Sequence, residues 1–306
     1  MAILLFKQLV QLFIMIALGF VLVKSKLLSS KDSRILSVIC IYLIYPCVIV
    51  NAFQVDYSKE IAAGFTLALV AAILIHVVLL VLVGILGKAL SLDNVEKASL
   101  IYSNAGNLII PLVTAMFGQE YVIYASGFMF VQTFLIFTHG AALMSGSKKF
   151  EWKKIVTNVN VISTLVGLLL FLFHIKLPAM VKGVTSSMSA LVGPVSMIMI
   201  GMILADADWK RVLTNKRIYL LTALRLIGIP LVILCLLKFT PLYQMAPDGR
   251  TILMISLMAT MTPAASTITQ MSQLYNNKPE YTASINIMTT VFCIATMPLL
   301  IALYEL

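Results

Sequence analysis

The stretch SNAGNLIIP, residues 103–111, decides how this sequence is read. It lies inside an apolar segment, residues 98–117, that is long enough to cross a bilayer as a helix. Asparagine is costly in hydrocarbon, and proline removes a backbone donor and clashes with the preceding turn. Membrane helices tolerate such residues where the freed backbone meets protein or a watery cavity. The stretch therefore predicts an interrupted helix inside a membrane protein.

The composition of the 306-residue chain supports this interpretation, because 61% of its residues are hydrophobic and 11% are charged. Apolar runs of about 20 residues recur along the chain, and the first is too long for a cleavable signal peptide. We therefore predict an all-α polytopic membrane protein with ten transmembrane helices. The predicted spans are residues 3–23, 34–54, 61–86, 98–117, 121–143, 155–173, 183–205, 217–238, 251–271 and 281–304.

The net charge of +10 does not indicate nucleic-acid binding, because the Lys and Arg residues lie in short loops and form no basic stripe among aromatic residues. Fifteen of them lie in the loops after spans one, three, five, seven and nine, against six on the opposite side. The positive-inside rule then predicts a multi-pass protein of the cell membrane with both termini outside.

Three pairs of unusual intramembrane residues recur at nearly one spacing. The pairs are Pro46 with Pro194, His76 with Arg225, and Pro111 with Pro263, separated by 148, 149 and 152 positions. Because five spans is an odd number, a second copy must enter the membrane from the opposite side. We predict two inverted five-helix repeats, residues 1–143 and 155–306, joined by a cytoplasmic linker at 144–154.

Spans four and nine contain SNAGNLIIPLVTAM and ATMTPAASTITQM, and both are predicted to be broken at equivalent places. Two such helices point to a substrate site at mid-membrane, where half-helix N-termini direct partial positive charge. The alternative is that the prolines merely kink packed helices. The predicted substrate-binding residues are Asn104, Asn107, Pro111, Asn51, Thr262, Pro263, Ser266 and Thr267.

Asn107 is the residue expected to donate to a substrate carboxylate, facing Thr262 from span nine. It lies four residues before Pro111, so its carbonyl lacks the usual helical donor. An asparagine binds a carboxylate through neutral donors. The predicted membrane interior holds almost no carboxylates, which disfavours an antiporter driven by a buried acid pair and favours a small organic anion as substrate.

Arg225 and the intramembrane histidines each leave two interpretations open. Arg225 either snorkels to the cytoplasmic interface or attracts an anion and orders a contact between domains. His76 and His139 are either proton-coupling groups or hydrogen-bonded packing residues. The four cysteines have no CxxC spacing and are expected to be reduced packing residues, with no metal and no cofactor.

The ten spans, SNAGNLIIPL in span four and TPAAS in span nine resemble the auxin efflux carrier family, whose prokaryotic members include malonate and malate permease-like proteins. The resemblance implies two inverted repeats, a scaffold domain and a transport domain. It also implies that the fourth and ninth helices cross in an X at an organic-anion site, as in bile-acid and sodium/proton transporters of related fold. Two departures are the short 144–154 loop and a span nine with hydroxyl residues where plant carriers suggest asparagine.

The expected function is that of a secondary transporter, which moves a small organic anion such as malonate, malate or an auxin-like acid by alternating access. The alternatives are a sodium-coupled symporter of the bile-acid type, or a channel or receptor. We find no HExxH, GxSxG or GxxxxGK motif and expect no enzyme activity. The expected partners are the substrate anion, membrane lipid and a second copy of the chain, bound through the scaffold helices.

Overall fold

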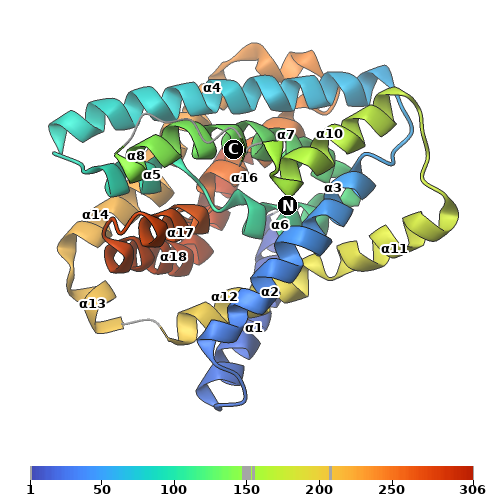
Figure 1. Ribbon diagram of the computed structural model, residues 1–306. Coiled ribbons are helices and arrows are strands. Elements are labelled where there is room, and N and C mark those ends of the chain that lie inside the picture. The colour runs from blue at the N-terminus through green and yellow to red at the C-terminus, as the bar shows by residue number, and fades with distance from the viewer. Residues whose placement is uncertain (1, 147–152, 154–155, 207–208, 306) are drawn as a thin grey trace.

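The computed structural model describes residues 2–146, 153, 156–206 and 209–305 (Figure 1). Across the described part of the chain the regular structure is entirely helical. Five continuous stretches are long and apolar enough to cross a membrane, and a sixth is added if the bent helix α18 (Pro279–Glu305) counts as one span. The five are Ser30–Ala52, Lys59–Ala89, Gln119–Ser145, Ala179–Ala205 and Lys216–Phe239. The predicted all-helical, multi-pass class is therefore confirmed.

The five stretches coincide with the predicted spans 34–54, 61–86, 121–143, 183–205 and 217–238. The other five predicted spans fall on one helix of 23 residues and on four that are shorter, broken or bent. These are α1 (Ala2–Lys24), α5 (Asn94–Ile101) with α6 (Ala105–Phe117), α10 (Val159–Leu172), α16 (Gly249–Met261) with α17 (Ser266–Leu274), and α18. Most of the predicted linker, 144–154, lies outside the described residues.

Several of the long stretches are divided into shorter helical elements. In chain order these are η1 (Ser30–Asp32), α2 (Ser33–Ile39), η2 (Cys40–Ile44), α3 (Tyr45–Ala52), η3 (Gln119–Tyr121), α7 (Val122–Leu135), η4 (Ile136–Gly140), α8 (Ala141–Ser145), α11 (Ala179–Ala190), α12 (Val192–Ala205), α14 (Lys216–Ala223), η5 (Leu224–Gly228) and α15 (Ile229–Phe239). Two further elements lie in connections, α13 (Trp209–Thr214) and η6 (Pro241–Met245).

Prolines account for two of these divisions. Pro46 and Pro230 each lie at the start of a helix that follows a π-helical turn, η2 and η5 respectively. A proline donates no backbone hydrogen bond and its ring clashes with the carbonyl four residues earlier, so the preceding turn widens. In η4 the cause is different, because the Thr138 hydroxyl donates to the carbonyls of Phe134 and Leu135.

The longest uninterrupted helix, α4 (Lys59–Ala89), runs across the top of Figure 1. The Ser58 hydroxyl caps its first turn by accepting a hydrogen bond from the Ile61 backbone at 3.1 Å. Its exposed face carries Ile73, Val77, Val81 and Ile85, one residue per turn. A stripe of this kind, apolar and exposed, is the face that a membrane helix presents to lipid.

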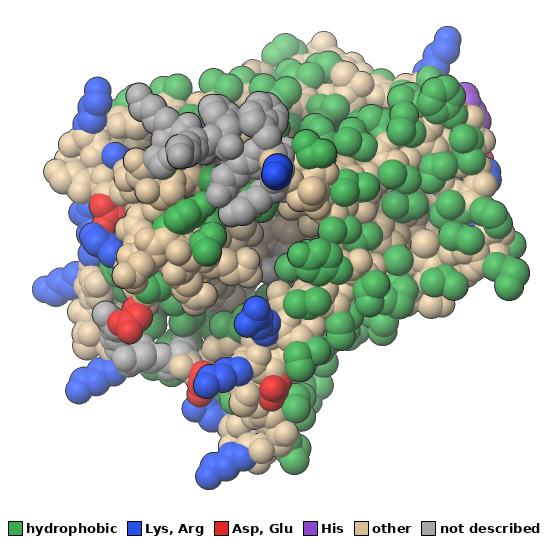
Figure 2. Space-filling view, in the orientation of Figure 1, with side chains coloured by type: hydrophobic (Ala, Val, Ile, Leu, Met, Phe, Trp, Pro, Cys, Tyr) green, Lys and Arg blue, Asp and Glu red, His purple; other side chains and the backbone are tan. Residues whose placement is uncertain are grey.

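Charge is segregated on the surface. Figure 2 shows hydrophobic side chains over the right of the view, while Lys and Arg gather at the left and below. At the left of Figure 1 lie the C-terminal end of α4 and the start of α14, whose basic residues include Lys88, Lys216 and Arg217. This segregation is what a protein that lies across a bilayer requires.

Helices α1 and α12 pack unusually closely, side by side in the lower part of Figure 1. A Cβ at Gly19 would collide with the Ile198 carbonyl, and one at Gly201 would collide with the Ile16 carbonyl. Glycine is therefore required at both positions, because small residues let membrane helices approach backbone to backbone.

The two interrupted helices meet at their breaks. Between α5 and α6 the chain runs through residues 102–104, and between α16 and α17 through residues 262–265. An antiparallel β-bridge pairs Ser103 with Ala264. The Asn104 N–H donates to the Pro263 carbonyl at 2.8 Å, and the Ala265 N–H donates to the Tyr102 carbonyl at 3.0 Å. Each break thus satisfies backbone groups of the other at membrane depth.

The predicted equivalence of Pro111 and Pro263 in the two halves of the chain is wrong, because the two prolines lie at different positions relative to the breaks. Pro263 lies in the second break itself, whereas Pro111 lies inside α6, several residues after the first break. The structural counterpart of the second break is the segment at 102–104, which is bonded to it directly.

Candidate functional site

The first break is held by a side chain of helix α7. The Gln132 Oε1 atom accepts hydrogen bonds from the Ser103 N–H at 3.0 Å and from its hydroxyl at 2.6 Å. The Gln132 amide donates back to the Ser103 carbonyl at 2.9 Å. The Tyr102 hydroxyl bonds the Leu135 carbonyl and the His139 Nδ1. A single glutamine therefore replaces the backbone partners that Ser103 lost when the helix ended.

The second break is held in an analogous way by helix α18. The Ala264 N–H donates to the Thr289 hydroxyl at 3.1 Å, and the Asn286 side chain donates to the Ala264 carbonyl at 2.5 Å. Ala264 is therefore bonded through both its backbone groups, as Ser103 is. The two breaks are fixed in place by neighbouring helices as well as by each other.

Arg225, in η5, joins the ends of both helices that lead into the breaks. It is fully buried, and its guanidinium donates to the Leu100 carbonyl in the last turn of α5 and to the Thr262 carbonyl after α16, each at 3.0 Å. Helix C-termini carry partial negative charge, which a cation stabilises. Arg225 therefore does not snorkel to the interface but neutralises two half-helix C-termini inside the protein.

A polar cavity of about 250 Å³ opens beside the breaks. The start of α6 contributes Asn104 and Gly106, and the start of α17 contributes Ser266 and Thr267. The remaining lining residues come from the second, fifth and sixth predicted spans, from the first break and from the middle of α17: Ser37, Ile41, Tyr42, Tyr45, Ser103, Met129, Gln132, Thr133, Ile136, Phe137, Asn158, Asn160 and Gln270.

The electrostatic character of this cavity follows from its lining. None of the described residues that line it carries a charge, while the N-termini of two half-helices open into it. A helix N-terminus carries about half a positive charge, and its first N–H groups have no helical acceptors. With Arg225 covering the opposite helix ends, the cavity is poised to hold a small anion through hydroxyl, amide and backbone donors.

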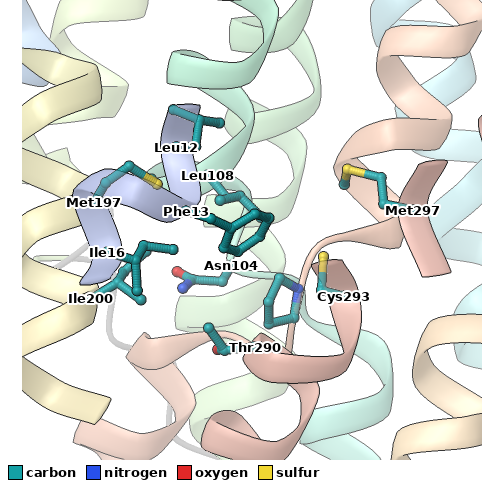
Figure 3. Close-up of a pocket in the computed structure, with 11 residues that line it drawn as sticks. Leu12, Phe13, Ile16, Asn104, Leu108, Met197, Ile200, Thr290, Cys293 and Met297 are labelled. Carbon is teal, nitrogen blue, oxygen red and sulfur yellow. The ribbon is translucent and has the colours of Figure 1, made fainter. Parts of the chain in front are cut away.

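Asn104 lies at the centre of the site. It is the residue before α6, and its Oδ1 accepts a hydrogen bond from the Ser266 hydroxyl at 3.2 Å. Besides the polar cavity it borders a small apolar one of about 20 Å³, with Phe13, Met197 and Cys293 (Figure 3). Figure 3 shows the Asn104 amide pointing between α1 and α12. The asparagine thus links the breaks to the tightly packed α1–α12 pair.

The predicted site residues separate into two groups. Asn104, Ser266 and Thr267 line the polar cavity, and Pro263 borders the small one. Thr262 is buried, with its carbonyl on Arg225 and its hydroxyl donating to Ala259. Among the described side chains, those of Asn51, Pro111 and His76 line neither cavity.

Of that second group, Asn51 accepts a hydrogen bond from Thr185 at 3.4 Å, near the far end of α3. Pro111 is buried within α6. His76 is buried in α4. The side chain of Asn107 lies outside the described residues, so its predicted contact with a substrate stays a prediction.

Sequence reasoning missed the residues that hold the breaks, Gln132, Asn286 and Thr289. A signal was present, because Gln132 interrupts the apolar run FMFVQTFLIF and Asn286 interrupts a predicted span. Amides in hydrocarbon need partners, so each of them was a candidate for an interhelical hydrogen bond. The sequence did not indicate which backbone they would meet.

An ion-pair network lies at the other end of α5. Buried Glu96 receives two hydrogen bonds from Arg217, at 2.8 and 3.0 Å, and one from the Tyr281 hydroxyl at 2.8 Å. Burial alone would raise the pKa of Glu96, but these bonds and the Asp93 backbone lower it overall. Lys278 pairs with Asp93 at 2.7 Å. The network ties the starts of α5, α14 and α18 together.

Comparison with protein families agrees with this architecture. A family model described as a membrane transport protein matches residues 4–151 and 147–301. A comparison with curated proteins finds no match. Because the two matched regions together cover nearly the whole chain, the predicted resemblance is confirmed. This helical, multi-pass chain, with two broken helices paired beside a polar cavity, belongs to the membrane transport protein family of the auxin efflux carriers.

Proposed function

We propose that the protein is a secondary transporter that moves a small organic anion across the cell membrane by alternating access. The observation that carries the proposal is the arrangement of the four half-helix ends. The N-termini of α6 and α17 open into one uncharged cavity, while Arg225 covers the C-termini of α5 and α16. The site therefore has net attraction for an anion without an exposed fixed charge.

A carboxylate suits this site for two reasons. Its charge is met by two helix N-termini, and its oxygens accept hydrogen bonds from neutral donors such as Asn104 and Ser266. A volume of about 250 Å³ favours a compact acid such as malonate or malate. Neutral donors also suit transport, since the anion must leave again, and a fixed lysine or arginine would hold it more strongly.

The symmetry of the breaks supports the proposed inverted repeat. Ser103 and Ala264 form a reciprocal pair, and each is held by amide or hydroxyl groups from the last helix of its own half, α7 or α18. We propose the halves 1–143 and 155–306, with the linker 144–154, in which helices four and nine cross. The scaffold domain and the transport domain would each contain helices from both halves. Two copies of the chain would associate through helices of the scaffold domain.

The position of the cavity mouth supports an inward-facing state. Its lining includes Ser37 near the start of the second span, Asn158 near the start of the sixth and Gln270 near the end of the ninth. These helix ends adjoin the loops rich in Lys and Arg, which the positive-inside rule assigns to the cytoplasm. We propose that both termini face outward. Ser147→Cys should then resist an impermeant thiol reagent in intact cells, and ready labelling would reverse the orientation.

The test is a thermal-shift screen of purified protein with malonate, malate, acetate and an auxin-like aromatic acid. A ligand that binds only the folded state raises the apparent melting temperature, and at equal concentration a tighter ligand raises it more. The best acid is then used, radiolabelled, for counterflow in proteoliposomes. We expect counterflow, because a carrier exchanges substrate across the membrane and a channel does not.

Two outcomes would contradict the proposal. Stabilisation by none of the acids would remove the organic anion as substrate class. Flux without counterflow would indicate a channel. Repeating the assay with sodium replaced by choline separates a sodium-coupled symporter, whose transport stops, from the carrier proposed here.

A further inference from the structure

One buried ionisable side chain beside the breaks has no role in the proposed anion site. His76 lies near the middle of α4 and is 1% exposed. Its Nδ1 lies 2.7 Å from the Ala72 carbonyl. Because a carbonyl only accepts, Nδ1 carries the ring proton and the neutral imidazole leaves Nε2 as a bare acceptor. Nε2 has no hydrogen-bond partner.

The surroundings of this nitrogen lead directly to the breaks. The Phe128 ring packs against the imidazole with 4.9 Å between centroids. Gln132 lies one turn after Phe128 on the same face of α7, and no hydrogen bond closes between it and Nε2. The positive charge of Arg225 acts on the ring from η5. The Nε of Arg225 is unpartnered as well. His76 therefore packs against the face of α7 that carries Gln132, and it lies within the electrostatic field of Arg225.

The other ionisable groups on the helices packed against α4 lie far from His76. Tyr124 of α7 packs at Gly64 and Lys97 of α5 packs at Gly87, about 18 and 16 Å away along α4. Three further charged groups on these helices contact other partners. Arg250 of α16 lies over the Tyr243 ring of η6, and Lys238 of α15 donates to the Leu303 carbonyl. Glu96 of α5 pairs with Arg217. Arg225 is thus the charged group that acts on the imidazole among the described residues.

We propose that His76 is a proton site that couples anion binding at the breaks to the uptake of one proton. The inference rests on the proposed function. The proton is taken up from bulk solvent and binds Nε2, which changes from a bare acceptor into a donor. Its available acceptor is the Oε1 of Gln132, and no other covalent bond forms or breaks.

This step alters the anion site because Oε1 is already fully used. An amide oxygen has two acceptor positions, and the N–H and hydroxyl of Ser103 occupy both. A donor on His76 displaces one of them, and Ser103 lines the cavity. The freed donor then turns toward the anion. Protonation in α4 thus adds a hydrogen-bond donor at the substrate site.

Charge makes the coupling reciprocal. A proton on His76 places a second positive charge beside Arg225, and the bound anion offsets this repulsion. Each ligand therefore favours the other, by the same factor in both directions. One proton with each anion makes the transport of a monocarboxylate electroneutral, whereas a dicarboxylate carries one net negative charge.

The test measures the affinity of whichever of malonate, malate and acetate stabilises the protein most, between about pH 7.0 and 8.5. Carboxylic acids stay ionised throughout this range. With one proton taken up per anion, affinity should rise about tenfold for each unit that the pH falls. His76→Gln should still bind the acid but lose this slope. His174→Gln, which alters an exposed histidine packed on Tyr57 away from the breaks, is the matched control and should retain it.

Each outcome decides the matter. A wild-type protein that binds without a pH slope, or a His76→Gln variant that keeps the slope, overturns the coupling and leaves the transporter intact. If none of the three acids binds, both the proton coupling and the proposed transport of an organic anion are contradicted. If His76→Gln does not fold, proton uptake by the wild type in weakly buffered solution decides instead, with one proton per bound anion expected and none overturning the inference.

Discussion

The break at 102–104 and the break at 262–265 follow the same backbone plan with different side chains. Each helix before a break ends at a residue with extended backbone, Tyr102 in the first case and Thr262 in the second. The next paired residues, Ser103 and Ala264, form the β-bridge between the breaks. The first break is polar, with Ser103 and Asn104, whereas the second is proline and alanine. The pairing of two interrupted helices therefore needs backbone partners from neighbouring helices, while the polar side chains can be concentrated on one of the two breaks.

The strongest test removes the residue that serves both breaks. Arg225→Gln should lose two charge-assisted hydrogen bonds, together about 3–6 kcal/mol, and should lower the melting temperature and abolish transport. Arg225→Lys should retain part of both, because the charge remains and the fork is lost. Near-native stability and counterflow in both variants would show that the helix ends need no counter-charge.

A second test compares the two supports. Gln132→Leu removes three hydrogen bonds and leaves two buried backbone groups of Ser103 unpaired, so we expect a loss of about 2–4 kcal/mol. Asn286→Leu removes one bond to Ala264 and should cost about 1 kcal/mol. Thermal unfolding measures both. Equal losses would show that the two breaks are equally dependent on their supports.

A third test concerns the polar character of the first break. Asn104→Ala should weaken binding of the best carboxylate by about 1–3 kcal/mol, the value of a hydrogen bond to a charged group, without changing the fold. Asn107→Ala tests the sequence hypothesis in the same assay. Asn51→Ala is the matched control, since its side chain bonds Thr185 instead, and should bind normally. Normal binding by both Asn104→Ala and Asn107→Ala would move the site away from α6.

The smallest effect is expected at the far end of the helix before the first break. The folded-state pKa of Glu96 lies below its ordinary value of 4.5, so its contribution to stability is present above that value. It is lost as the pH falls through the folded-state pKa. The melting temperature of the wild type should therefore fall below about pH 4.5, whereas Glu96→Gln should be less stable at neutral pH and less sensitive to acid. A parallel acid dependence in both proteins would exclude Glu96.

Much of the fold could be predicted because hydrocarbon imposes simple demands. Apolar length placed the five long stretches and the two interrupted helices within a few residues. The exact place of the first break was not predicted, because the repeat was aligned on Pro111 and Pro263, and Pro111 lies inside α6. A proline inside a membrane helix is accommodated by its neighbours, whereas the break at 102–104 exists because residues 263–265 offer an antiparallel partner.

The candidate site was predicted only in part, for a similar reason. Asn104, Ser266 and Thr267 belong to the motifs themselves, so their meeting followed once the breaks were paired. Gln132 and Asn286 come from helices whose neighbours the chain order does not reveal. Asn51 was predicted as a site residue because it is polar and lies inside a span, yet it lies at the far end of α3 and accepts a hydrogen bond from Thr185.

The order of the residues is enough to predict that this chain is helical, crosses the membrane several times and breaks two helices at polar, proline-containing motifs. Composition and apolar length suffice for that, since backbone groups in lipid must be satisfied within helices. Only the tertiary structure decided that Arg225 faces two helix C-termini, that Gln132 holds Ser103, and that the two N-termini share one cavity. The physical reason is that an arginine or an amide is satisfied by any carbonyl, and packing alone selects which one it reaches.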